Sequence, residues 1–219
     1  MNETATDSKR AVIAGSSFAG LTAAFELRKR LDSKHEVVVI EPRDHFNFIP
    51  SLIWVLFGMR DPDDVTFKLE PVHSKKGIGF INEWVTGFDL DNRKVMTSGG
   101  QEVEYDSLLV AAGPKLAFDR IDGPGPENGY TQMSETMAKV AAQNMAADIQ
   151  GGERREMPMS EMEAICILDA GNAGIIFKAD HVLGESEHPH VMSGPQARWA
   201  KIAFEKIYLN SRKHGHPIL

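Results

Sequence analysis

The sequence predicts an α/β fold, in which helices cover a parallel sheet and a smaller C-terminal part follows. An apolar run at residues 10–15 leads through a glycine into residues 19–31, where apolar positions recur at helical spacing. A second apolar run, typical of a buried strand, follows at residues 35–42. Strand, helix and strand within about forty residues form a βαβ unit, which requires a parallel sheet with a right-handed crossover.

The next part of the chain predicts an antiparallel insertion. Residues 79–113 have the pattern of three or four strands, with DNRK and SGGQ as turns. The last of these strands, SLLVAAG at 107–113, is apolar enough to lie buried in the sheet. A β-meander is therefore inserted before the chain returns to the parallel sheet. Residues 118–132 are rich in Gly and Pro and predict a surface loop, so we place a domain boundary after residue 132.

Residues 133–219 predict a small α+β cap. A helix is expected from Ser134, as N-cap, to the glycine pair at 151–152. A hairpin around the turn DAGNAG follows within residues 163–183, and a final helix lies between Pro195 and Gly215. The apolar and aromatic positions of this last helix favour packing on the sheet over contact with a membrane.

Composition excludes several classes of function. The chain has 219 residues, 42% of them hydrophobic, and a net charge of −7, which argues against nucleic acid as a partner. The single cysteine, Cys166, excludes an intramolecular disulfide and a Cys-rich zinc site. The N-terminus has no apolar signal segment, and no apolar run is long enough to span a membrane. We expect a cytoplasmic protein.

The segment GSSFAG at residues 15–20 resembles a dinucleotide-binding turn, with Ser17 at the place of the middle glycine. Gly15 and Gly20 match the glycines for the tight turn and for helix–strand packing, while the Ser17 hydroxyl can donate to a phosphate. Glu41 ends the second strand about 20 positions later, where an acid binds ribose hydroxyls and repels a 2′-phosphate. FAD or NAD fits this pattern and NADP does not. The alternative interpretation is a plain strand-to-helix turn with Glu41 as a surface acid.

The remaining reactive side chains favour structural roles. Cys166 lies in the apolar run AICILD, which predicts a packed small side chain rather than a nucleophile. His181, His188 and His190 lack the spacing of metal ligands on a helix, so a solvated loop is favoured over a metal site. His45 follows Glu41 closely and is expected near the adenosine side. No catalytic residue is predicted.

Three ordered motifs carry a family resemblance: VIAGSSFAGLTAAFELRK, VVVIEPRDHFNFIPSL and YDSLLVAAGPKL. Together they resemble the two-dinucleotide-domain flavoproteins, specifically sulfide:quinone oxidoreductases and flavocytochrome c sulfide dehydrogenases, with type II NADH dehydrogenases more distant. The resemblance implies a Rossmann-like FAD-binding domain in residues 1–132. It also implies that the cofactor is surrounded at its pyrophosphate by Gly15, Ser16, Ser17 and Gly20, at its ribose by Glu41, and at its flavin by Pro50, Ala112 and Gly113.

The resemblance also has a gap. Members of this group carry a central NAD-like domain, whereas here GYTQ at 129–132 runs directly into MSETMAKV, and no Gly-Asp dipeptide occurs. The resemblance implies an FAD-dependent oxidoreductase that passes electrons to a quinone-like acceptor, with peripheral contact to the inner face of the membrane through the C-terminal helix. A non-catalytic nucleotide binder stays open as an alternative, as does an incomplete unit that needs a partner chain or forms a homo-oligomer.

Overall fold

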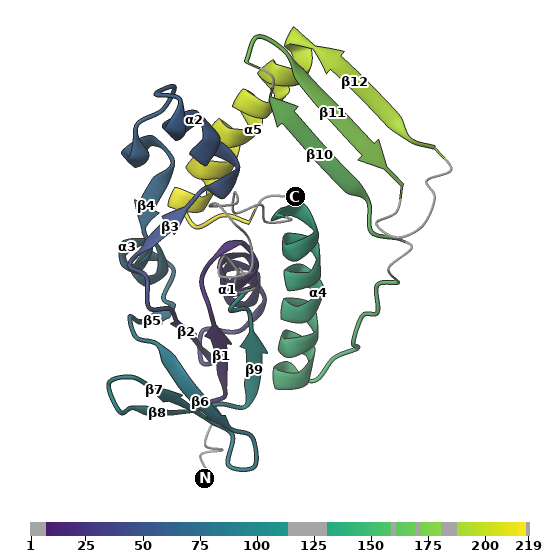
Figure 1. Ribbon diagram of the computed structural model, residues 1–219. Coiled ribbons are helices and arrows are strands. Elements are labelled where there is room, and N and C mark those ends of the chain that lie inside the picture. Colours follow the sequence, from purple (N-terminus) through teal and green to yellow (C-terminus); the bar gives the residue numbers. More distant parts are fainter. Residues whose placement is uncertain (1–7, 114–130, 159–160, 170, 181–187, 218–219) are drawn as a thin grey trace, which may run out of the picture.

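The computed structural model describes residues 8–113, 131–158, 161–169, 171–180 and 188–217, with only the backbone of residues 131–134 (Figure 1). Its central sheet is parallel and has the strand order β5-β2-β1-β9. The four strands are β1 (Arg10–Ala14), β2 (Glu36–Ile40), β5 (Gly79–Ile81) and β9 (Ser107–Val110). The predicted α/β fold with a Rossmann-like parallel sheet is confirmed.

Helix α1 (Phe18–Arg30) connects β1 to β2 and lies beside α4 (Thr131–Gln150) (Figure 1). Leu21, Phe25 and Leu27 are buried, as the helical spacing of the sequence predicts, and form the core with the buried strand β1. Helix α4 begins at Thr131, so Ser134 lies in its first turn and the predicted N-cap there is wrong. Residues 118–130 of the predicted loop lie outside the described residues, and the division after residue 132 stays a prediction.

Short elements that have no clear sequence pattern join β2 to β5. These are β3 (His45–Asn47), the 3₁₀ helix η1 (Ile49–Ser51), α2 (Leu52–Leu56), the 3₁₀ helix η2 (Pro62–Asp64), β4 (Thr66–Lys68) and α3 (Leu69–Lys75). Strands β3 and β4 pair antiparallel and carry the stacked rings of Phe46 and Phe67. Both rings are buried against the core, so this segment is anchored next to the parallel sheet.

The predicted meander is present as three antiparallel strands, β6 (Val85–Asp89), β7 (Lys94–Thr97) and β8 (Glu102–Glu104). It leads into β9, whose burial was predicted wrongly. Val110 is 56% exposed and the other residues of β9 are half-buried. The reason is that β9 pairs on one side only, with β1, and forms an edge of the described sheet.

The C-terminal part contains the predicted hairpin and the predicted final helix. Its elements are β10 (Ala164–Asp169), β11 (Gly174–Ala179), β12 (His190–Gly194) and α5 (Pro195–Lys213). The predicted loop is wrong at His190, because this residue begins β12, which adds a third strand to the hairpin. Helix α5 packs along one face of this sheet (Figure 1). Cys166 pairs with Phe177 across the strands and both are exposed, so the prediction of a packed cysteine is wrong.

Helix α5 is fixed to the first part by buried charged groups. The fully buried Arg212 places Nη2 2.6 Å from Glu135 Oε1 on α4 and 2.8 Å from Thr22 Oγ1 on α1. Tyr208 donates its hydroxyl to the same carboxylate oxygen, and burial raises the pKa of Tyr208 far above its usual range. These contacts join three helices through one carboxylate.

A second buried carboxylate joins α5 to the segment before β4. Glu205 accepts hydrogen bonds from the Ser51 hydroxyl and, at 2.9 Å, from Arg60 Nε. Tyr208 and Leu209 are buried, as the packing prediction requires, but Trp199 is 68% exposed. No helix in the described part of the chain is long and apolar enough to cross a membrane.

Candidate functional site

The predicted site residues meet at the carboxyl edge of the parallel sheet. Gly15 N donates to Ile40 O at 2.8 Å, and Ala111 N donates to Ala14 O at 2.7 Å. The segments that follow β1, β2 and β9 therefore lie next to one another. In open parallel sheets this edge is where ligands bind. The structure brings together the glycine turn, Glu41, Ala112 and Gly113, which lie far apart in the sequence.

The glycines of the turn are required by the fold itself. Gly15 has a φ of +111°, and a Cβ atom there would lie 2.4 Å from the Ala111 carbonyl oxygen. A Cβ atom on Gly20 would lie 1.9 Å from the carbonyl oxygen of Gly15, where α1 approaches the turn. Ser17, at the middle position, has an extended backbone with φ −84° and makes no capping hydrogen bond with its side chain. A glycine is therefore not needed at Ser17 for the chain to turn.

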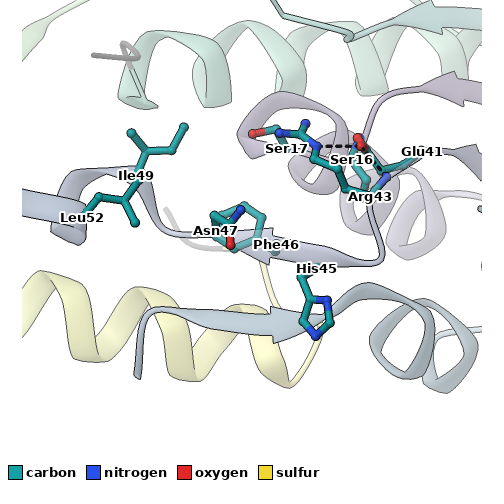
Figure 2. A pocket seen from close by; sticks show the side chains of 9 residues that line it. All are labelled: Ser16, Ser17, Glu41, Arg43, His45, Phe46, Asn47, Ile49 and Leu52. Atoms are coloured by element: carbon teal, nitrogen blue, oxygen red, sulfur yellow. Dashed lines mark hydrogen bonds and ion pairs between the residues drawn. The ribbon is translucent and has the colours of Figure 1, made fainter. Parts of the chain in front are cut away.

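Glu41 is buried, with 3% of its surface exposed, and its carboxylate is held by two main-chain donors and one side-chain donor. Oε2 accepts the Ser16 N–H at 2.8 Å, while Oε1 accepts the Arg43 N–H at 3.1 Å and Arg43 Nε at 2.8 Å. Figure 2 shows Arg43 reaching back over Glu41 beside the glycine turn. The alternative interpretation of Glu41 as a surface acid is wrong, because this carboxylate is tied into the turn.

The turn is also held by a histidine that no sequence motif predicts. His73 on α3 is fully buried, and its Nε2 lies 2.9 Å from the Ser16 hydroxyl oxygen. Burial lowers the pKa of His73 to about 4, so the ring is neutral at pH 7. No pattern marks this residue, because its partner lies 57 positions earlier in the chain.

A cavity of about 40 Å³ opens beside these groups and follows β3 from Glu41 towards α2 (Figure 2). It is lined by Ser16, Ser17, Glu41, Arg43, His45, Phe46, Asn47, Ile49 and Leu52. Pro50 lies in η1 between two of the lining residues, and Ala112 and Gly113 are exposed at the end of β9. His45 lines the cavity, but its Nδ1 is paired with Asp44 at 2.6 Å and the ring points away from Glu41 (Figure 2).

The described residues contain no group of three or more His, Cys, Asp or Glu side chains that could hold a metal ion. His188 and His190 belong to that part of the chain, whereas His181 lies outside it. Glu41, which the sequence predicts as a ribose-binding acid, is the buried carboxylate that lines this cavity.

Comparison with known proteins identifies the family. Residues 9–178 match the family described as pyridine nucleotide-disulphide oxidoreductase. The chain belongs to this family. Among curated relatives, the sulfide-quinone reductase of Aquifex aeolicus (strain VF5) is 34% identical over 110 residues, which are 50% of this chain and 25% of that protein. The mitochondrial sulfide:quinone oxidoreductase of Dictyostelium discoideum is 31% identical over 117 residues, covering 51% of this chain and 25% of the relative.

The solved structures extend the likeness beyond the matched sequence. The sulfide:quinone oxidoreductase structure from Aquifex aeolicus superposes with a TM-score of 0.87, covering 96% of this chain and 92% of that chain at 18% identity. This likeness extends the shared fold to the C-terminal part. The resemblance to sulfide:quinone oxidoreductases is confirmed, while the matched sequence spans a quarter of the length of the two curated relatives.

Proposed function

We propose that the chain binds FAD through the adenosine diphosphate half of the cofactor. The observation that carries this proposal is the buried Glu41 carboxylate, held 2.8 Å from the Ser16 N–H at the end of β2. A carboxylate at this place accepts hydrogen bonds from ribose hydroxyls. Gly15 and Gly20 bring the start of α1 close to the turn, where backbone N–H groups and the helix dipole favour a pyrophosphate. Ser16 and Ser17 line the cavity on the same side.

The flavin half has fewer partners. Pro50 would approach the isoalloxazine, and Ala112 and Gly113 would line it, but the last two are exposed in the structure. The isoalloxazine would lie partly in water, which supports weaker binding than in a closed flavin site. Bound FAD would accept and pass on electrons, while the chain supplies position and electrostatics. The names of the relatives support a quinone as the acceptor.

Exposed apolar side chains support contact with a quinone or a membrane surface. Leu56 and Phe57, at the end of α2, are 76% and 68% exposed, and Leu52 of the same helix lines the cavity. Helix α5 adjoins α2, because the Lys201 ammonium lies 4.4 Å from the centre of the Trp54 ring. We propose peripheral contact at the inner face of the membrane. The cytoplasmic location and a homo-oligomeric state stay predictions.

The second candidate is a nucleotide binder without turnover, or a unit completed by a partner chain. It is favoured by the sheet topology, because the described residues contain a single parallel sheet and hence no second nucleotide domain. Both candidates bind the adenosine half of FAD in the same way. They differ only in whether the bound flavin is reduced and reoxidised. Reduction of the bound flavin therefore separates the two.

Visible absorbance of the purified chain, reconstituted with excess FAD, tests the proposal. We expect flavin bands that are lost on desalting, a dissociation constant in the micromolar range, and competition by ADP at comparable concentration. Bleaching by NADH or sulfide followed by reoxidation with a soluble quinone would support the enzyme, and stable yellow colour without bleaching would support the binder. The proposal is contradicted if FAD does not bind. It is also contradicted if FAD binds and ADP does not displace it.

A further inference from the structure

The glycine turn rests on a buried histidine that no step of the proposed function uses. The His73 ring packs against the rings of Phe80 and Phe25, whose centres lie 5.3 Å and 6.1 Å from its own. A fully buried polar ring requires a reason, because burying an imidazole without a full set of hydrogen bonds costs stability. Within the described residues, the ring makes one hydrogen bond, to the Ser16 hydroxyl.

Ser16 connects this histidine to the ribose-binding carboxylate. Its hydroxyl oxygen lies 2.9 Å from His73 Nε2, and its backbone N–H donates to Glu41 Oε2 at 2.8 Å. Both contacts belong to one buried residue, so the hydrogen bond at its side chain helps to anchor the backbone segment that carries its N–H. Ser16 thereby holds one oxygen of the Glu41 carboxylate. The other oxygen accepts a hydrogen bond from Arg43, whose side chain is 57% exposed.

The protonation state of the ring fits this role. Nδ1 is buried without a partner in the described part of the chain. An orphaned buried N–H is rarer than an acceptor left without a donor, which favours the neutral tautomer with its hydrogen on Nε2. In that tautomer His73 donates to the Ser16 oxygen, and the rings of Phe25 and Phe80 keep the imidazole from turning away.

We propose that His73 is a positioning residue of the nucleotide site, which acts through Ser16 to orient the Glu41 carboxylate towards the ribose hydroxyls of a bound adenine nucleotide. The inference rests on the proposed function. It adds a specificity-determining residue on α3, an element that contributes no side chain to the cavity. Its consequence is selective: loss of the histidine should lower the preference for a nucleotide with a ribose 2′-hydroxyl over one without it, whatever its effect on phosphate binding.

Isothermal titration with ADP and with 2′-deoxy-ADP measures this selectivity in the full chain. We expect the native chain to bind ADP about tenfold more tightly than 2′-deoxy-ADP, as the loss of one hydrogen bond to a carboxylate predicts. His73→Phe should lower that ratio to about threefold or less, with little change for 2′-deoxy-ADP. His73→Gln places an amide nitrogen near the position of Nε2 and should restore most of the ratio.

Two further variants keep the test decisive. His35→Phe is the matched control, because His35 is also buried and accepts the Lys9 N–H at 3.1 Å, at the opposite end of β1 from the turn. It should lower stability and leave the ratio unchanged. Ser16→Ala reaches the same contact from the other side, so it should lower the ratio even if the His73 variants fail to fold. Adding His73→Phe to it should lower the ratio no further.

The outcomes separate the two proposals. An unchanged ratio in His73→Phe, or in Ser16→Ala where the His73 variants do not fold, overturns the positioning role while ADP binding still supports the site. An equal fall in His35→Phe also overturns it, because general destabilisation would then be the cause. Absence of ADP binding in the native chain overturns the proposed function itself. An imidazole ¹⁵N spectrum that shows the hydrogen of His73 on Nδ1 contradicts the donor assignment.

Discussion

Replacing Glu41 by glutamine changes one atom and tests the centre of the proposed site. The native carboxylate accepts three N–H groups, at 2.8, 3.1 and 2.8 Å, while almost fully buried. In Glu41→Gln a single carbonyl oxygen remains, and the new amide group must face Ser16 N–H or Arg43, which are both donors. A hydrogen bond to a charged group contributes about 1.5 to 3 kcal/mol, so the free energy of unfolding should fall by about that amount.

Nucleotide affinity should fall for the same reason. A ribose hydroxyl loses its charged acceptor, which corresponds to an increase of about ten- to a hundredfold in the dissociation constants of ADP and FAD. The assay is titration calorimetry with ADP, with urea unfolding in parallel. Arg43→Gln is the control, because Arg43 is a largely exposed partner whose loss should cost about 1 kcal/mol or less. Unchanged ADP affinity in a folded Glu41→Gln variant would refute the assignment of the ribose site.

Three further predictions concern other parts of the molecule. Sulfide-dependent quinone reduction by this chain alone should be negligible, because one cysteine cannot form the disulfide that exchange chemistry requires; turnover that persists in Cys166→Ala would contradict this. Burial holds the pKa of His73 at about 4 against 6.5 in an unfolded chain, so the unfolded state binds more protons between these values. Stability should therefore fall by about 3 kcal/mol as the pH drops from about 6.5 to 4, and urea unfolding of His73→Phe should lack this part of the pH dependence. Arg212→Met leaves the Glu135 carboxylate buried without its cation and should cost about 3 to 5 kcal/mol in urea unfolding. A fall in the free energy of unfolding of less than about 1 kcal/mol would contradict this, because it would show that water solvates the Glu135 carboxylate in place of Arg212.

The features predicted correctly from the sequence are those with a local signal. The βαβ unit follows from apolar runs and one helical period between residues 10 and 42, and the structure contains it within a residue or two. Glu41 could be singled out because its distance from the glycine turn along the chain is fixed by the length of one helix and one strand. The position of His73 depends instead on how α3 packs under the turn, and such tertiary contacts leave no period in the sequence.

Two errors have a common physical cause. An apolar run predicts burial on both faces and on both edges of a strand, but the sequence does not tell how many neighbours the strand has. Val110 is exposed because β9 pairs on one side only, and Cys166 is exposed because α5 covers only one face of the C-terminal sheet. The number of layers around a strand is a property of the assembled fold. A run such as AICILD therefore predicts the strand correctly and its burial wrongly.

The serine at the middle of the glycine turn is explained by a difference between what the fold requires and what a ligand requires. Gly15 has a positive φ and no room for a side chain, and Gly20 has no room either, so both are needed whether or not a nucleotide binds. Ser17 has an ordinary φ of −84°, so the middle position constrains only the approach of a ligand. The glycines of this turn are therefore weak evidence for binding, because packing alone accounts for them. The evidence that remains is polar: a carboxylate buried next to the turn and held by Ser16 and Arg43, at the position where an acid binds ribose hydroxyls.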